Sequence, residues 1–311
     1  MQSIRHAAVC ATMILSAATV AAYTGKIERS HTFAARDGAT VVVDATSHRV
    51  DVTSRPGDTV EVSVWVEVSG SESKVKNALN ELTPVFEDSG SELVVRSVRK
   101  DGGWTGWGSL RVAGRIEIAM PADMDLRVDV GSGEVTMRGD FGQAELAVDT
   151  GSGSVHLRGA ARALTADTGS GSVEADVTRA LERFVADTGS GGVQLEGGAD
   201  HVTADTGSGG IRLSGLTGDA LLDAGSGSIT ASWTGVRPGM RVVADTGSGG
   251  VDLEFPTGTE LAGEVTTGSG RIRSDFPATR IDDDEIRFVG GPNAVSVRVD
   301  TGSGGAELRA R

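Results

Sequence analysis

The sequence Asp-Thr-Gly-Ser-Gly at residues 149–153 decides the fold, because its pattern recurs to the end of the chain. The Gly-Ser-Gly part begins at Gly131, Gly151, Gly169, Gly189, Gly207, Gly225, Gly247, Gly268 and Gly302. Successive starts are 20, 18, 20, 18, 18, 22, 21 and 34 residues apart. Self-similarity at such a period is typical of repeat architectures, in which each repeat is one supersecondary unit.

Apolar and polar residues alternate on both sides of each Gly-Ser-Gly. The residues three and five positions before its start are aliphatic or aromatic in every repeat, with Gly263 as the exception. The residues four and six positions after its start are apolar except for Ser274, and the residue between them is always polar. A period of two predicts a strand with one buried face. We therefore predict an all-β fold, a parallel β-solenoid whose coils are strand, Gly-Ser-Gly corner and strand.

A second corner is expected to close each coil, and it often contains a glycine, such as Gly139, Gly159, Gly197 or Gly215. Glycine suits corners because it adopts positive φ, and small residues also let neighbouring corners stack. One coil buries too few side chains to fold alone, so stability must come from stacking. The 34-residue spacing before Gly302 predicts an extra hairpin or excursion ahead of a final coil.

The first part of the chain differs from the repeats. Valines alternate from Val60 to Val68, which predicts a strand, and residues 73–82 form the one helical stretch, ended by Pro84. We interpret residues 23–115 as an N-terminal β-rich capping region with one short helix. Residues 116–311 are then the solenoid repeats, continuous with that region as one structural unit.

Residues 1–22 have the pattern of a secretory signal peptide. Arg5 precedes a short apolar run, and small residues stand before Tyr23. Cleavage there would remove Cys10, the only cysteine, which excludes disulfides and thiolate sites from the mature chain. No second apolar span follows, so we expect no membrane span after cleavage. The expected location is periplasmic, secreted or at the cell surface.

The chain is acidic, with 43 Asp and Glu against 29 Lys and Arg and a formal net charge of −14. This balance argues against nucleic acid as a partner, since nucleic-acid binding depends on neutralising phosphates. The histidines show no metal-ligand spacing, and Gly-Ser-Gly joins two strands without a helix that would cradle a phosphate. We therefore expect no cofactor.

A family resemblance rests on three stretches of the sequence. These are the alternating N-terminal strands, Gly-Arg-Ile-Glu-Ile-Ala-Met-Pro at residues 114–121, and the recurrent Asp-x-Gly-Ser-Gly-x-Val units. The last residues, from Asn293 on, fit the same pattern. The chain resembles the bacterial "putative adhesin" family of β-strand-repeat proteins, a domain of unknown function. The resemblance implies a parallel β-solenoid and a surface or envelope location, and it brings no catalytic residues.

Asp-Thr-Gly-Ser is also found in aspartic proteases, but their chemistry needs two aspartates that face each other and share a proton. Here the aspartates head many identical loops, which would stack along one edge, so we reject the protease interpretation. We expect instead that each aspartate accepts N–H hydrogen bonds from its own Gly-Ser-Gly corner.

A row of stacked carboxylates would repel one another, and compensation by cations is the alternative to corner capping. The candidates for calcium binding are Asp149, Asp167, Asp187, Asp205 and Asp245. A Gly-rich stretch carries Trp104 and Trp107, which we consider both as a contact site for a sugar or protein and as part of a cap over the end of the solenoid.

These features favour an exported, non-catalytic β-repeat protein, an adhesin-like binding or scaffold module of the bacterial cell envelope. Its expected partner is an envelope protein or a glycan. The alternatives are a β-helix enzyme acting on polysaccharide, and a component of envelope stress or signalling. The enzyme alternative requires a local cluster of basic and carboxylate residues in a groove, whereas the outward residues here vary from coil to coil.

Overall fold

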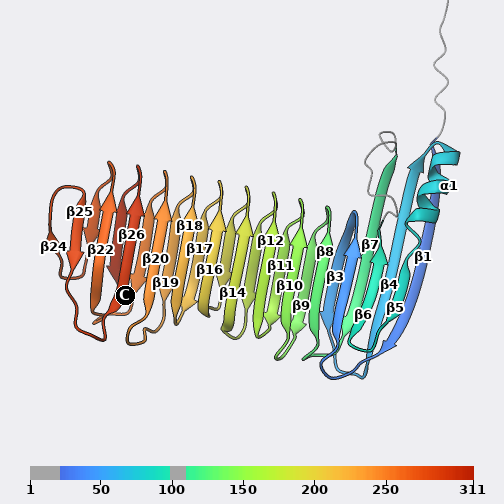
Figure 1. The fold of residues 1–311 in the computed structure, drawn as a ribbon, viewed down its shortest axis with the longest axis horizontal. Coiled ribbons are helices and arrows are strands. Elements are labelled where there is room, and N and C mark those ends of the chain that lie inside the picture. Colours follow the sequence, from blue (N-terminus) through green and yellow to red (C-terminus); the bar gives the residue numbers. More distant parts are fainter. Residues whose placement is uncertain (1–21, 99–109) are drawn as a thin grey trace, which may run out of the picture.

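Two long β-sheets pack face to face and form a rod whose strands run across its long axis (Figure 1). The computed structural model describes residues 22–98 and 110–311. Residues 1–21, which contain most of the expected signal peptide, lie outside this range. Sheet A consists, in spatial order, of β1 (Tyr23–Ala34), β4 (Thr59–Gly70), β7 (Arg111–Met120), β3 (His48–Ser54), β9 (Val135–Asp140), β11 (Val155–Ala160), β13 (Val173–Val177), β15 (Val193–Glu196), β17 (Ile211–Leu216), β19 (Ile229–Trp233), β21 (Val251–Phe255), β27 (Ala306–Ala310) and β23 (Ile272–Ser274).

Sheet B faces sheet A along the whole rod. It consists, from the C-terminal end, of β24 (Thr279–Arg280), β25 (Glu285–Phe288), β22 (Leu261–Thr267), β26 (Val295–Thr301), β20 (Arg241–Thr246), β18 (Asp219–Ala224), β16 (Ala199–Thr206), β14 (Leu181–Thr188), β12 (Ala163–Thr168), β10 (Glu145–Thr150), β8 (Asp125–Val130), β2 (Thr40–Ala45), β6 (Glu92–Ser97) and β5 (Val85–Asp88).

Each coil contributes one strand to each sheet, joined by the Gly-Ser-Gly corner. Neighbouring coils pair in parallel and in register, so that Leu146 lies opposite Leu164 in sheet B and Val155 lies opposite Val173 in sheet A. The predicted parallel β-solenoid is therefore confirmed. The alternating residues on both sides of the corners point inward and form one continuous core, as the sequence pattern predicts.

Two different physical reasons place glycine at the two kinds of corner. At the second corners Gly139, Gly159, Gly197 and Gly215 adopt positive φ, as expected. The Gly-Ser-Gly glycines do not have positive φ, so that explanation is wrong for them. They are required by stacking: a Cβ on Gly191 would lie 1.9 Å from the carbonyl oxygen of Gly171 in the neighbouring coil.

The N-terminal end does not follow the order of the sequence. The coil formed by β2 and β3 lies between the coil of β6 and β7 and the coil of β8 and β9. The parallel stack thus already includes residues 40–54, before the Gly-Ser-Gly pattern begins. Antiparallel strands then complete the end: β4 and β1 follow β7 in sheet A, and β5 follows β6 in sheet B.

The predicted helix is α1 (Glu72–Glu81), which contacts β1 and β4 at the N-terminal end of the rod (Figure 1). Its buried residues Val75 and Ala78 join the core. Leu79 and Val75 lie close to Gly25 of β1, where a side chain would not fit. The helix therefore covers the inner face of the last strands of sheet A.

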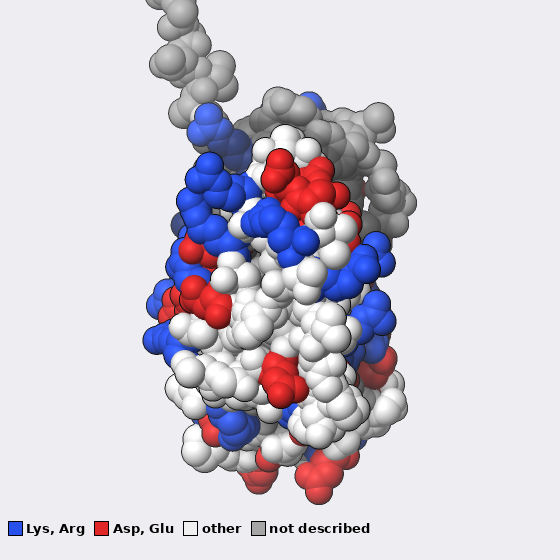
Figure 2. Space-filling view, turned by 90° about the vertical axis from the view of Figure 1, so that its left-hand side faces the viewer, with Lys and Arg blue, Asp and Glu red and all other residues white. Residues whose placement is uncertain are grey.

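The C-terminal end repeats the same change of order. The last coil, β26 and β27, lies between the coil of β20 and β21 and the coil of β22 and β23. The 34 residues from Gly268 to Gly302 therefore contain the second strand of the outermost coil, β23, an antiparallel hairpin of β24 and β25 that pairs with β22, and β26. The predicted excursion is confirmed. Figure 2 views this end, where side chains of both charge signs are intermixed around largely uncharged surface.

Within residues 22–98 and 110–311 no helix has the length and apolar character that crossing a membrane requires.

Candidate functional site

The aspartates that precede the corners form one unbroken row on the outer face of sheet B. We call this row the aspartate ladder; its members are Asp44, Asp129, Asp149, Asp167, Asp187, Asp205, Asp223, Asp245 and Asp300. Each lies directly opposite the next in the parallel register. Asp44 is half-buried and the others are exposed. Arg96 ends the row on one side, 3.5 Å from Asp44, and Thr266 follows Asp300 on the other.

The threonine after each aspartate, and not the aspartate itself, caps the corner. Thr188 is buried, and its Oγ1 accepts a hydrogen bond from the N–H of Gly191 at 2.9 Å. The same hydroxyl donates to the carbonyl oxygen of Gly171 in the neighbouring coil at 2.8 Å. Corresponding pairs of bonds occur at Thr168 and Thr206. The expectation that aspartate caps its own corner is therefore wrong, because strand alternation turns the threonine inward and the aspartate outward.

Electrostatic repulsion acts along the ladder. Parallel strands are about 4.8 Å apart, and two charges at that distance repel by about 0.9 kcal/mol even at the dielectric constant of water. Partial burial, followed by repulsion from the carboxylates on either side, raises the pKa of Asp149, Asp187 and Asp223, which are alternate members of the row. Binding of protons or cations to the ladder would therefore reduce the electrostatic repulsion between its carboxylates.

The five calcium candidates are all in the ladder, four of them on consecutive strands and Asp245 beyond Asp223. They lie in a straight row and not around a common point. Among the residues that the structure describes, no group of three His, Cys, Asp or Glu side chains is arranged to hold a metal ion. Asp44 was missed from the sequence because Thr46-Ser47-His48 stand at its corner in place of Gly-Ser-Gly. The alternating valines before it are the feature that would have revealed it.

A second row of outward side chains runs beside the ladder, two residues earlier in each strand. In the middle of the rod it consists of small or apolar residues: Ala147, Thr165, Val185, Thr203, Leu221 and Val243. Leu221 is 51% exposed, which is unusual for a leucine in this protein. A third row contains ion pairs, such as those of Glu145 with Arg162 and Arg183. The outer face of sheet B therefore offers an acidic edge next to an apolar strip.

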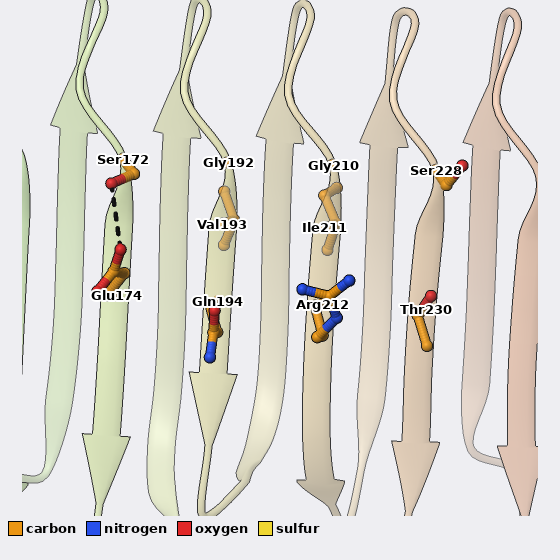
Figure 3. Close-up of a pocket in the computed structure, with 10 residues that line it drawn as sticks. All are labelled: Ser172, Glu174, Gly192, Val193, Gln194, Gly210, Ile211, Arg212, Ser228 and Thr230. Carbon is orange, nitrogen blue, oxygen red and sulfur yellow. Dashed lines mark hydrogen bonds between the residues drawn. The ribbon is translucent and has the colours of Figure 1, made fainter.

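The outer face of sheet A has a shallow depression of about 340 Å³ near the Gly-Ser-Gly corners (Figure 3). Gly192 and Gly210 form its floor, and Glu174, Gln194 and Arg212 line its side. A Cβ on Gly192 or Gly210 would lie 3.3 or 3.1 Å from the nearest carbonyl oxygen, a tight approach that a small shift of the neighbour would relieve. Three other coils carry serine at the same position, Ser154, Ser172 and Ser228, so stacking does not require glycine there. The depression is polar and open.

The remaining sequence candidates do not join either surface. Trp104 and Trp107 lie outside the described residues, so their role stays a prediction. His156 lies between Glu134 and Glu174 on sheet A, at 3.7 and 3.2 Å, as a surface residue of that face. His48, not singled out from the sequence, is fully buried and contacts the hydroxyl of Ser97 at 3.1 Å.

Comparison with known proteins gives one family match. A family model described as Toastrack DUF4097 matches residues 42–309, which is most of the chain and includes the coil of β2 and β3. No curated protein matches the chain significantly.

Matches to solved structures have low sequence identity. A "putative lipid binding protein" from Parabacteroides distasonis ATCC 8503 is 14% identical, with 90% of this chain and 96% of that chain covered and a TM-score of 0.52. A "putative adhesin" from Parabacteroides merdae ATCC 43184 is 12% identical, with 90% and 95% covered and a TM-score of 0.46. At this identity the first likeness concerns the fold alone.

Proposed function

The chain belongs to the Toastrack DUF4097 family, and we propose that within it this protein is an exported, non-catalytic binding or scaffold module of the cell envelope. The aspartate ladder carries the proposal. Nine carboxylates held at a constant spacing on a rigid sheet form a linear, multivalent acidic surface. A partner that carries regularly spaced positive charges, such as a basic segment of an envelope protein, complements this surface best.

Multiplicity supports binding over catalysis. A catalytic group needs a local environment that differs from its surroundings, whereas each ladder residue between Asp44 and Asp300 has an aspartate on either side. The adjacent apolar strip, with Leu221 at its most exposed point, adds surface that the side chains of an extended partner would bury. A linear partner that lies along the rod would contact both rows at once.

The proposal is tested with a synthetic oligolysine long enough to span several coils, added to protein purified from cells that express the full chain. The ladder variant is Asp167→Asn, Asp187→Asn and Asp205→Asn together. The matched control, on sheet A, is Glu174→Gln, Asp176→Asn and Glu196→Gln, which removes the same charge from adjacent coils. Exposed ion pairs contribute about 0.2–1 kcal/mol each, so we expect about tenfold weaker binding for the ladder variant.

The two variants separate a specific surface from net charge. Equal loss of binding in both would mean that the oligolysine reads only overall charge, and the ladder would lose its assigned role. If the protein bound neutral glycans, and the ladder variant bound them equally well, the depression on sheet A would become the candidate binding site. Turnover of any envelope polymer would contradict the non-catalytic assignment. Fractionation of the expressing cells tests export. Recovery of the chain in the cytoplasm alone would refute it.

A further inference from the structure

The two ends of the rod differ in how their sheet edges are finished. At the C-terminal end the edge strands are short, with three residues in β23 and two in β24, and at the N-terminal end β5 has four. The fourth edge is β1, which has 12 residues. Within residues 22–98 and 110–311, β4 is its only strand partner. Soluble proteins keep exposed edges short or interrupted, because a long edge pairs readily with another strand.

The register of β1 shows which backbone groups are free. The Ala35 N–H donates to the Asp58 carbonyl at 2.8 Å, which continues the pairing of β1 with β4. In an antiparallel pair, hydrogen-bonded positions alternate with positions whose N–H and C=O groups point away. The odd-numbered residues of β1 therefore bond to β4. The groups that project from the edge, and that pair with no strand of the described residues, belong to Thr24, Lys26, Glu28, Ser30, Thr32 and Ala34.

The edge of β1 carries a positive charge at Lys26 and a negative charge at Glu28, so two copies of it can pair with opposite charges facing each other. We propose that β1 pairs with β1 of a second copy of the chain, antiparallel and centred on Ile27, so that two rods join into a dimer whose A sheets form one continuous sheet. In this register Lys26 lies opposite Glu28 of the second copy, twice by symmetry. The same residues carry the free N–H and C=O groups, so backbone hydrogen bonds form at these positions. In the single chain Lys26 contacts Glu67 at 2.8 Å, whereas Glu28 has no ion pair among the described residues.

Neighbouring registers are disfavoured by charge. A shift of the centre by one residue in either direction would put Lys26 or Glu28 directly opposite itself, and like charges across strands are destabilising. The Ile27 register also brings Tyr23, 41% exposed, opposite His31 of the second copy. His31 already stacks on Phe86 with ring centroids 5.1 Å apart, so Tyr23 would extend an existing aromatic cluster. Such a contact maps the same surface onto itself, as a twofold interface requires.

The first test is sedimentation equilibrium of protein purified from cells that express the full chain. We expect a dimer that weakens about tenfold or more in Lys26→Glu and in Glu28→Lys, because each change creates two like-charge pairs. The double variant, with both changes, restores opposite charges across the interface and should dimerise again. Glu174→Lys, in the middle of sheet A, is the control that leaves association unchanged. Circular dichroism checks that each variant is folded.

The second test fixes the register. In a Cys10→Ser background, Ile27→Cys places two thiols opposite each other at a position without hydrogen bonds, where Cα atoms are about 4.5 Å apart and a disulfide fits. Oxidation should give a covalent dimer. Arg29→Cys, which would face Gly25 of the second copy, should not cross-link. A monomer at all concentrations, a double variant that stays dissociated, or cross-linking at 29 and not at 27 overturns the proposal. A monomer would leave this edge to a strand of another protein.

Discussion

The Oγ1 atom of Thr188 lies 2.9 Å from the backbone nitrogen of Gly191, whose N–H donates to it. This contact closes one corner, and the hydroxyl's second bond, to Gly171, ties that corner to the coil before it. Because the pair of bonds recurs along the rod, the threonine row is a buried polar seam that links successive coils. The threonines are buried, so the loss of a hydroxyl leaves its partners without an equivalent hydrogen bond and is costly.

Thr188→Val should destabilise the protein by about 1–3 kcal/mol, because the isosteric change leaves the Gly191 N–H and the Gly171 carbonyl without partners. Urea unfolding at neutral pH measures the difference. Thr203→Val, at an outward position of β16, is the control and should change the unfolding free energy by less than about 0.5 kcal/mol. Equal effects at both sites would contradict the capping role of Thr188.

Gly191→Ala and Gly192→Ala, at adjacent positions, should have very different effects. A Cβ on Gly191 would lie 1.9 Å from the Gly171 carbonyl oxygen, so the coils must move apart, and we expect a loss of about 3 kcal/mol or more. A Cβ on Gly192 would lie 3.3 Å from the nearest carbonyl oxygen. There the lower entropy of the unfolded alanine chain offsets the tighter contact, and the net change should be within about 0.5 kcal/mol.

Thermal and urea unfolding compare the two alanine variants. If Gly192→Ala were as damaging as Gly191→Ala, the glycine floor of the depression would be a requirement of stacking. The depression would then be a consequence of coil stacking and would give no support for a binding site on sheet A.

Asp187→Asn should stabilise the protein at pH 7 by about 0.5–1 kcal/mol, because Asp187 has a like charge on each side. The pKa of Asp187 is raised by burial and by these neighbours, so its charge opposes folding above that pKa and ceases to do so below it. The advantage of asparagine should therefore shrink as pH falls through the raised pKa. Glu182→Gln, exposed on the same strand, is the control. A destabilised Asp187→Asn would mean that the ladder holds cations in solution.

His48 should make the protein less stable in weak acid. Burial lowers its pKa from 6.5 to about 4. As pH falls below 6.5 the unfolded chain takes up a proton that the folded chain refuses, so stability declines until about pH 4, by a total of about 3 kcal/mol. Above pH 6.5 His48 has no such effect. His48→Gln should flatten the pH dependence of urea unfolding over this window, and an unchanged slope would show that other groups cause it.

The ladder and His48 act in opposite directions as pH falls. Protonation of ladder carboxylates removes repulsion and favours folding, whereas protonation of His48 in the unfolded chain favours unfolding. The pH dependence of the wild-type protein is the sum of both. Measuring Asp187→Asn and His48→Gln in the same series separates them.

Much of the candidate site was predictable from residue positions. The aspartates before each Gly-Ser-Gly were expected to stack on one edge, and eight of the nine ladder members carry that signal. Asp44 lacks it, because its corner contains no glycine. The alternation also predicts which side each residue faces. In β10, Thr150 has the same parity as the buried residues before it, whereas Asp149 has the opposite parity. Applying the alternation through the last residue before the corner gives the correct cap.

The sequence by itself determined the coil: alternation set the buried faces, and glycine allowed the corners to stack. Only the tertiary structure decided the order of the coils at the two ends. The coil of β2 and β3 comes first in the sequence but lies inside the coil of β6 and β7, and the coil of β26 and β27 comes last but lies inside the coil of β22 and β23. The physical reason is that every coil presents similar edges above and below, so local pattern does not distinguish one stacking partner from another. The order depends on long-range pairing and on the strands that finish each end. Those same contacts leave β1 as the one long open edge of the described rod.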